Sequence, residues 1–333
     1  MTGTSIAIHQ VSRPHGMPGA EHFAFVEESR PVPAEGTALV ENIYLSVDPY
    51  MREEMDGGWE LNRPLEGRSI GRVIESRTSA LAVGDLVWHG HSWRTHAVVD
   101  PSTTRLLPVL PGVPLSAHLS VLGGTGLSAY VGLTRIARLQ PGEDLFISAA
   151  AGGVGSAAGQ IARLLGVGRL VGSAGSPAKV KHLTERLGFD AAFDYHDGPV
   201  GELLHRAAPQ GIDVYLDNVG GEHLEGAISA LRDHGRIAWC GAVGQYNSTE
   251  PPVAPRNLYD VVGKSLRLEG FLVRNHMNVR DELYEFLVPH IRSGRVVPDE
   301  TVVEGFEHMV DAFLGMLRGA NTGKMIVQVS EAT

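Results

Sequence analysis

The stretch Leu145–Gly166, with the sequence LFISAAAGGVGSAAGQIARLLG, constrains what this chain can fold into more than any other segment. Its first three residues predict a buried strand, and the glycines within 152–155 predict a sharp turn that lets the backbone approach a ligand closely. Apolar residues at helical spacing follow, so a helix is expected to begin at the turn, where its free N–H groups can hold a pyrophosphate. A glycine triplet alone is weak support, because α/β proteins without a nucleotide also use such turns.

Segments typical of strands and helices alternate after this turn, which predicts an α/β fold with a doubly wound parallel sheet of the Rossmann type. Helices are expected over residues 176–188, 200–208 and 223–235. Besides 145–147, the expected strands are 169–175, 191–195, 212–220, 236–243 and 265–273. Because this unit starts only near residue 119, a separate domain is expected to precede it.

That first domain, residues 1–118, contains short β-like runs separated by Gly, Pro and Asp turns, at 37–48, 71–76, 85–90 and 95–99. It is predicted to be β-rich. The Rossmann domain is expected to span 119–291. Residues 292–333 are too few for a third domain and are expected to return to pack on the first. Their predicted helix is built on Phe306, Met309, Phe313 and Met316 and is followed by a strand.

Composition narrows the functional class. The chain has 333 residues, a formal net charge of -10 and one cysteine, Cys240. The negative charge argues against nucleic acid or an anionic membrane surface as the partner. No apolar run is long enough to span a bilayer and no leader is evident, so a cytoplasmic protein is expected. One cysteine excludes an internal disulfide and a zinc site of four thiolates.

The loop Asn42–Arg52, NIYLSVDPYMR, is a candidate for chemistry, because a loop that follows a strand can aim side chains into a cleft between domains. Tyr50 is the preferred polar donor in this loop. The alternative is a half-buried tyrosine whose hydroxyl bonds to the backbone. Asp48 and Arg52 are candidates for a structural ion pair that fixes the loop.

His89, His91 and His96 suggest a metal site, since residues two apart on a strand share a face. No neighbouring Cys or Glu completes a ligand set in the sequence, and histidines on exposed strands are common, so no metal is expected. A serine hydrolase is excluded because the chain has no G-x-S-x-G motif. No tyrosine has a lysine four positions later, which is the spacing of the short-chain dehydrogenases.

Several linked motifs in one order resemble those of the zinc-independent medium-chain dehydrogenase/reductase superfamily. They are SVDPYMR (46–52), GGTGLSAYVGL (123–133), SAAAGGVGSAAGQIA (148–162), GSAGSPAKV (172–180), DNVGG (217–221) and LRGANTGKMIVQV (317–329). Within that superfamily the chain is similar, over nearly its whole length, to the leukotriene B4 12-hydroxydehydrogenase/prostaglandin reductase family of NADP-dependent alkenal and enone reductases. The resemblance implies a GroES-like catalytic domain before the Rossmann domain. Zinc-dependent relatives carry a ligand cysteine where this chain has Ser46.

The resemblance implies NADP(H) as the cofactor. The implied contacts are Gly152, Gly153, Val154, Gly155, Lys179, Tyr195, Asn218, Cys240, Gly241, Ala242, Val243, Gly244, Gln245, Tyr246, Phe271, Leu272, Val273 and Asn321. The residues themselves favour NADP over NAD, because the strand ending at Gly172–Ala174 carries no acid for a ribose hydroxyl and Lys179 follows at the next helix. The alternative places Lys179 with Lys181 and Arg186 on a solvated helix face.

The implied reaction is hydride transfer to the β-carbon of an α,β-unsaturated ketone or aldehyde, followed by protonation of the α-carbon. Some family members have a tyrosine just before the last strand, where this chain has Gly263, with Tyr259 four residues earlier. The proton donor is therefore open between Tyr50, Tyr259 and a cofactor ribose hydroxyl with water. A quinone reductase of the same superfamily and a non-catalytic NADPH-binding protein are the alternative functions.

The edge of the sheet predicts an assembly. The last strand, Leu266–Val273, leaves its outer edge unpaired, and pairing with a second copy would close it, so a homodimer is expected. The other expected partner is a small enone, enal or quinone substrate. Residues 55–65 and 245–258 are expected to line or cover the entrance to its site.

Overall fold

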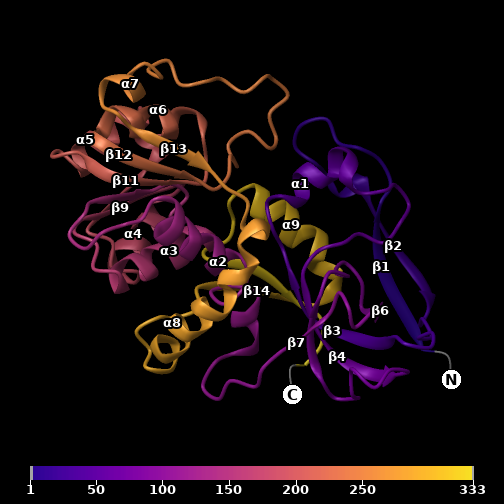
Figure 1. Cartoon of the computed structure of the whole chain (residues 1–333). Coiled ribbons are helices and arrows are strands. Elements are labelled where there is room, and N and C mark those ends of the chain that lie inside the picture. Colours follow the sequence, from indigo (N-terminus) through magenta and orange to yellow (C-terminus); the bar gives the residue numbers. More distant parts are fainter. Residues whose placement is uncertain (1–2, 332–333) are drawn as a thin grey trace. The chain divides into compact units, whose positions relative to one another are not determined.

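The computed structural model describes residues 3–331, and these residues divide into two units (Figure 1). The first unit contains the chain up to Leu119, Glu300–Asn321 and the residues from Met325 onward. The second contains Ser120–Asp299 and the short piece Thr322–Lys324. The tail expected as one returning segment, 292–333, is therefore shared between the units, because 292–299 and 322–324 fall in the second.

The second unit is built on a parallel sheet of six strands in the order β10-β9-β8-β11-β12-β13. This order is that of two mononucleotide-binding halves, so the predicted Rossmann sheet is confirmed. The strands are β8 (Leu145–Ile147), β9 (Leu170–Ala174), β10 (Ala191–Asp194), β11 (Ile212–Asp217), β12 (Leu231–Trp239) and β13 (Arg267–Gly270).

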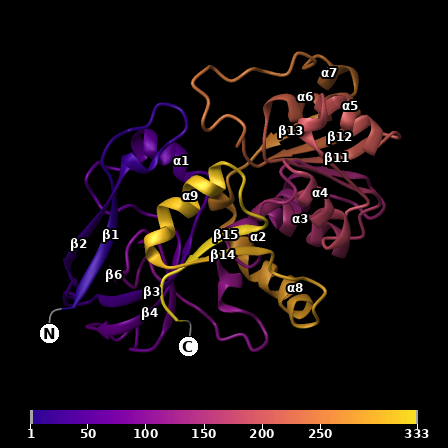
Figure 2. The same cartoon turned by 180° about the vertical axis from the view of Figure 1, so that it is seen from behind.

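Helices cover both faces of this sheet. Figures 1 and 2 show α3 (Gly153–Leu164) and α4 (Pro177–Glu185) on one face and α5 (Val200–Ala207) and α6 (Gly221–Ala230) on the other. The remaining helices of the unit are α2 (Gly124–Val131), α7 (Asp260–Gly263) and α8 (Arg280–Arg292). Helices on two faces are what right-handed crossovers between parallel strands require.

Several predicted boundaries in this unit are wrong: the strand expected over 212–220 ends at Asp217, and the strand expected over 236–243 runs from Leu231 to Trp239. The helix expected to reach residue 235 ends at Ala230, because buried Leu231 is already extended and pairs with Ile212. A bulge then follows in β12, with His234 at φ 64°, so the polar run after Leu231 is an irregular strand and not a helix end. The last strand is also shorter than the expected 265–273, since it pairs with β12 only over Arg267–Gly270.

The first unit is β-rich, as predicted. A seven-stranded sheet has the order β14-β15-β3-β4-β5-β7, and β6 pairs with β3; β1 and β2 form a separate antiparallel pair. Two short helices, α1 (Met51–Glu53) and α9 (Met309–Leu317), belong to this unit. The strands are β1 (Thr4–Gln10), β2 (Phe23–Ser29), β3 (Ala38–Ser46), β4 (Ser69–Ser76), β5 (Leu86–His89), β6 (His96–Val99), β7 (Arg105–Leu106), β14 (Glu300–Glu304) and β15 (Lys324–Gln328).

An aromatic cluster holds the tail helix α9 in the first unit. Trp93 is fully buried, its ring stacks on Phe23 at 5.7 Å, and Phe313 of α9 meets it edge-on at 5.5 Å. Phe313 also contacts the ring of Phe23 at 6.0 Å. Aromatic pairs of this geometry stabilise beyond their buried area. Residues far apart in the sequence therefore share one core.

We expect Phe313→Ala to lower the free energy of unfolding of the first unit by about 3–5 kcal/mol, because it opens a cavity beside Trp93. Denaturant unfolding followed by tryptophan fluorescence measures this loss. Val83→Ala is the control, since Val83 is 66% exposed and its truncation should change stability little. Equal losses in the two variants would contradict the role given to Phe313.

Candidate functional site

The glycine turn joins β8 to α3 in the manner the sequence predicts. Gly152 is extended, with φ -87° and ψ 178°, and caps α3, which begins at Gly153. A side chain at Gly155 would place its Cβ 2.5 Å from the Ala149 oxygen and the Ala150 Cα, so only glycine fits there. The first N–H groups of α3 have no partners within the helix and are oriented to bind an anion.

A short piece of the late chain lies beside this turn. Gly323 forms a parallel bridge with Gly152, and its N–H donates to the Ala151 oxygen at 2.8 Å. The Lys324 side chain is buried, with its Cδ 3.3 Å from the position that a Cβ on Gly153 would occupy. Sequence reasoning missed this neighbour. Its signal was the motif LRGANTGKMIVQV, whose glycine and lysine carried no assigned role.

Lys179 lies near the end of β9, at the start of α4. Ser176 caps this helix by accepting a hydrogen bond from the Lys179 N–H at 3.3 Å. Burial lowers the pKa of the Lys179 amine, whereas Lys181 is 70% exposed and pairs loosely with Glu185. The two lysines thus differ in burial: Lys181 fits the solvated-face alternative, and phosphate binding by Lys179 stays a prediction.

Tyr195 lies beside the end of the same strand. Its ring covers Gly175, because a Cβ on that glycine would lie 2.9 Å from the Tyr195 hydroxyl oxygen. The Tyr195 ring also meets His223 edge-on at 5.4 Å. Burial lowers the pKa of His223 to about 4, so this histidine is neutral. The end of β9 is therefore followed by the helix that carries Lys179 and is covered by the Tyr195 phenol.

The loops after β11 and β12 are held together by Asp217. Its Oδ1 accepts hydrogen bonds from the Tyr215 hydroxyl at 2.7 Å, the Ser148 hydroxyl at 3.2 Å and the N–H groups of Val219 and Gly220 at 2.8 Å. Burial raises the pKa of this carboxyl above its usual range. Its backbone oxygen accepts from the Cys240 N–H at 2.8 Å. One residue thus fixes both loops.

The predicted contacts in these loops are accordingly close to one another. The Asn218 amide donates to the Ser148 oxygen at 2.8 Å, and the Asn218 oxygen accepts from Val243 at 3.1 Å. Gly244 donates to Val219 at 3.3 Å, which brings the loop Cys240–Tyr246 onto DNVGG. Burial raises the pKa of the Cys240 thiol to about 12, so it is no nucleophile.

The remaining predicted cofactor contacts belong to different units: Phe271–Val273 to the second and Asn321 to the first. Phe271–Val273 follows β13, and the Phe271 ring lies 3.1 Å from the position of a Cβ on Gly132, in the second unit. Asn321 is buried and belongs to the first unit, next to the piece Thr322–Lys324. Tyr259 precedes α7 and is 81% exposed.

Tyr50 lies in the first unit at the start of α1, half-buried against the core around Trp93. Burial, with the Asp48 carboxylate as a second cause, raises the pKa of the Tyr50 hydroxyl to about 12, so it is protonated and can donate. The choice between a donor to the substrate and a hydroxyl bonded to the backbone stays a prediction.

The ion pairs of this loop differ from the expected one. Asp48 pairs with Arg68 at 3.3 Å and accepts from the Ser46 hydroxyl at 2.6 Å. Arg52 instead donates to Asp56 at 2.8 Å and to the Gly16 oxygen. The candidate pair Asp48–Arg52 is therefore wrong, because each residue meets a partner that the sequence places elsewhere.

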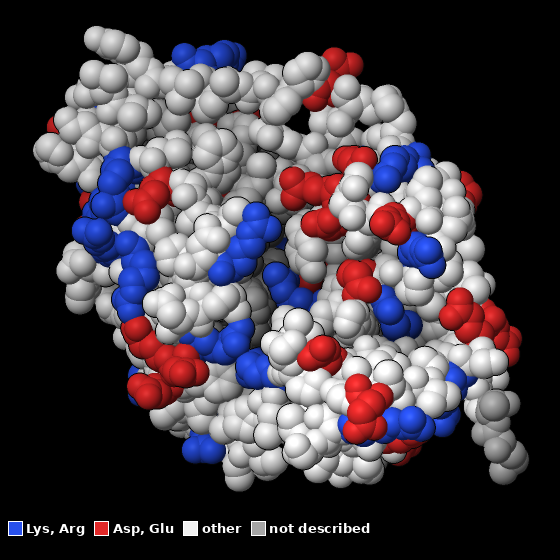
Figure 3. All heavy atoms as spheres, turned by 45° about the vertical axis from the view of Figure 1, so that its right-hand side comes forward, with Lys and Arg blue, Asp and Glu red and all other residues white. Residues whose placement is uncertain are grey.

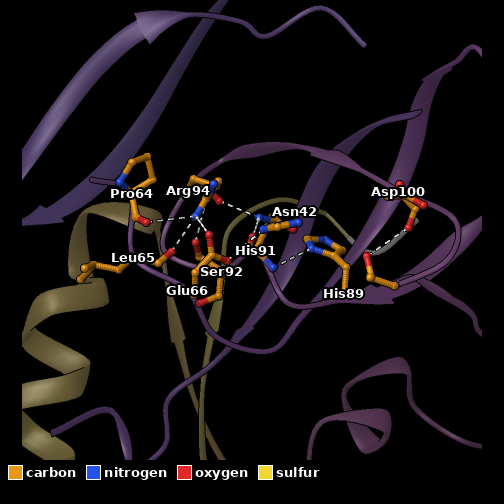
Figure 4. Close-up of polar contacts among 10 residues, drawn as sticks. Asn42, Pro64, Leu65, Glu66, His89, His91, Ser92, Arg94 and Asp100 are labelled. Atoms are coloured by element: carbon orange, nitrogen blue, oxygen red, sulfur yellow. Dashed lines mark hydrogen bonds and ion pairs between the residues drawn. The ribbon is translucent and has the colours of Figure 1, made fainter. Parts of the chain in front are cut away.

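Of the three candidate histidines, His89 and His91 lie close together, with their ring centroids 6.0 Å apart (Figure 4). His89 and His96 are buried and not on an exposed face, and burial lowers the pKa of His89 to about 3. His91 contacts Glu66 at 2.9 Å, and Arg94 bonds to the same carboxylate at 2.8 Å. In the described part of the chain, no group of three or more His, Cys, Asp or Glu could hold a metal ion.

Surface charge and helix length are the features that concern nucleic acid and membrane as partners. Figure 3 shows acidic and basic side chains interspersed on one face of the molecule. Among residues 3–331, every helix is too short or too polar to cross a bilayer.

Comparisons with known proteins agree with this geometry. A family model described as the N-terminal domain of oxidoreductase matches residues 7–107, and one described as zinc-binding dehydrogenase matches residues 153–290. Prostaglandin reductase 1 of Mus musculus is 42% identical over 318 residues, which cover 94% of this chain and 95% of that protein. NADPH-dependent curcumin reductase of Escherichia coli (strain K12) is 36% identical over 332 residues, covering 96% and 95%.

A solved structure is similar over the same length. CurA from Vibrio vulnificus, in complex with NADPH, has a TM-score of 0.91 and 33% identity, covering 98% of this chain and 99% of that one. A β-rich GroES-like unit and a Rossmann unit with its glycine turn define a medium-chain dehydrogenase/reductase. Within that superfamily, the chain belongs to the family of prostaglandin, alkenal and curcumin reductases.

Proposed function

We propose that this chain reduces the carbon–carbon double bond of α,β-unsaturated ketones and aldehydes with NADPH. The observation that carries the proposal is the glycine turn at Gly152–Gly155, from which helix α3 begins. It occurs in a chain that aligns over nearly its whole length with prostaglandin and curcumin reductases. It is an NADP-dependent oxidoreductase that acts on a conjugated double bond. A cytoplasmic location is part of the proposal and is tested by cell fractionation.

The residues present fit NADPH. The backbone N–H groups at the start of α3 suit the pyrophosphate, and the half-buried Lys179 amine, with no acid at the end of β9, suits the additional phosphate on the adenosine ribose. The loops braced by Asp217 and the residues Phe271–Val273 and Asn321 would hold the rest. When bound, NADPH supplies the hydride that is added to the β-carbon.

The chain itself contributes orientation and a hydrogen bond. Tyr50 donates to the carbonyl oxygen of the substrate, where negative charge develops as the β-carbon is reduced. With its pKa raised to about 12, this hydroxyl stays protonated at neutral pH and acts as a donor, not a base. Protonation of the α-carbon completes the reaction. Tyr259 and a ribose hydroxyl with water are the alternative donors.

The test is oxidation of NADPH in the presence of a panel of enones, enals, quinones and saturated alcohols. We expect turnover with enones and enals. A preference for quinones would favour the quinone reductase alternative. Binding of NADPH without turnover of any compound would leave a non-catalytic binding protein.

We expect Tyr50→Phe to lower kcat for an enone by about ten- to a hundredfold, with the Kd for NADPH unchanged, because the lost hydrogen bond acts on charge that develops in the transition state. Stopped-flow turnover and fluorescence titration with NADPH measure the two quantities. Tyr259→Phe serves as the matched variant. Parent turnover in Tyr50→Phe with a loss in Tyr259→Phe would transfer the donor role to Tyr259.

We expect Lys179→Ala to weaken NADPH binding by about ten- to a hundredfold, because a hydrogen bond between charged groups is lost. NADH, which lacks the phosphate, should be almost unaffected. The measurement is the ratio of kcat/KM for NADPH to that for NADH, with Lys181→Ala as the control on the same helix. An unchanged ratio in Lys179→Ala would return this lysine to a solvated role.

The proposal includes a homodimer formed along β13, the edge strand of the second unit. The support is an exposed edge together with exposed apolar side chains on the neighbouring segments: Leu258, Tyr259, Val262 and Leu272. Unpaired edges flanked by apolar residues favour association. Because β13 spans Arg267–Gly270, the paired segment would be shorter than Leu266–Val273.

Light scattering at micromolar concentration should give the mass of two chains. We expect Val262→Glu to shift the protein toward a monomer, because it places a charge among the exposed apolar side chains beside β13. Val83→Glu, in the first unit, should leave the mass unchanged. A monomeric mass of the parent protein would contradict the proposed dimer.

A further inference from the structure

Charged side chains lie around Ser46 in the first unit, and the reaction proposed above has not yet given them a role. The Ser46 hydroxyl, at the position where zinc-dependent relatives carry a ligand cysteine, donates to Asp48 at 2.6 Å. The same Asp48 oxygen pairs with the Arg68 guanidinium at 3.3 Å. The Asp48 carboxylate therefore links the Ser46 hydroxyl to the positively charged Arg68 guanidinium.

The guanidinium also covers Tyr50. Its Cζ lies 5.0 Å from the centroid of the Tyr50 ring, within the range of a cation–π contact. The Arg68 side chain is 30% exposed and that of Asp48 is 5% exposed. The carboxylate is thus enclosed, whereas the cation reaches the accessible side of the cluster together with the tyrosine.

The signs of these charges matter for a hydroxyl that must donate to a developing enolate. Burial is the main cause that raises the pKa of Tyr50; the Asp48 carboxylate, and to a smaller extent Glu54, raise it further and repel negative charge nearby, whereas Arg68 acts in the opposite direction. A cation on the ring face also draws electron density from the phenol, which strengthens its O–H as a donor. Arg68 therefore offsets the carboxylate that would otherwise oppose the reaction.

We propose that Arg68 is a positioning residue for Tyr50: it holds the phenol ring from one face and supplies the positive charge behind the hydroxyl while the carbonyl oxygen becomes negative. This inference rests on the proposed function and on Tyr50 as its donor. Asp48, which accepts a hydrogen bond from Ser46, holds the guanidinium in place. In this chain, the Arg68 guanidinium stabilises the negative charge that develops near Tyr50, as a metal ion would stabilise it on a substrate oxygen.

The test is a double-mutant cycle in the full chain. We expect Arg68→Met to lower kcat for an enone about tenfold in the parent, and less than twofold in the Tyr50→Phe background, because its effect passes through the hydroxyl. Arg68→Lys should retain most of the turnover, since it keeps the charge. The Kd for NADPH should stay at the parent value in all of these variants.

Two further variants guard against a loss caused by misfolding. Arg68→Met removes the cation beside Asp48, so Asp48→Asn/Arg68→Met removes both charges together. Its loss of kcat should be smaller than that of Arg68→Met alone, because the carboxylate that Arg68 offsets is gone as well. Arg63→Met is the control, because Arg63 is 74% exposed and should not affect kcat. Unfolding midpoints show which variants are folded.

The outcomes distinguish a failure of the role given to Arg68 from a failure of the proposed enone reduction. Equal losses from Arg68→Met in the parent and in Tyr50→Phe, or no loss in the parent, would overturn the role of Arg68 and leave enone reduction standing. If Tyr50→Phe keeps the parent turnover, the donor assignment fails, and the role of Arg68 fails with it. If the parent reduces no enone, the proposed function itself is wrong.

Discussion

The second unit depends on one close approach of backbone to backbone, at Gly155. The first turn of α3 lies on Ala149 and Ala150 with no room for a side chain, and Ala149 itself adopts a left-handed conformation at φ 47°. This contact fixes the angle at which the helix leaves β8 and therefore where its N–H groups point. Asp217 arranges the loops after β11 and β12 around the same end of the sheet: its buried carboxylate binds the first loop and its backbone oxygen binds the second. The anion-binding geometry thus follows from sterics, not from any one charged side chain.

Charge plays the larger part in the first unit. Arg52 and Arg68 are both held by a carboxylate, but in different settings. Arg52 is buried and bonds to the Gly16 carbonyl and Asp56, which ties a loop to the core. Arg68 pairs with Asp48 and keeps one side toward Tyr50 and solvent. Similar residues in a short stretch of chain therefore do different work, and which one meets Asp48 decides which can act on the tyrosine.

The fold could be read from the sequence wherever local pattern suffices. Residues 145–166 carry a strand, a turn and a helix in consecutive positions, so no distant partner is needed to recognise them. Predictions failed where a distant partner decides the outcome: Leu231 is a strand residue because Ile212 pairs with it, and Asp48 meets Arg68 because β3 and β4 are adjacent. The candidate site followed the same rule. The glycine turn and Lys179 were visible in the sequence, whereas Gly323 and Lys324 beside the turn were not, since only the folded chain brings them there.

The path of the chain near Gly323 has a consequence for the order of folding during synthesis. The second unit is continuous from Ser120 to Asp299 except for Thr322–Lys324, which reaches the glycine turn after Glu300–Asn321 has been added to the first unit. A nascent chain that has emerged as far as Asp299 holds every strand of the Rossmann sheet, yet Gly152 and Ala151 still lack the neighbour that bonds to them. The nucleotide turn is therefore completed only after residues 300–324 have been added, so a ribosome-bound intermediate that ends at Asp299 would carry a formed sheet with an unfinished cofactor site.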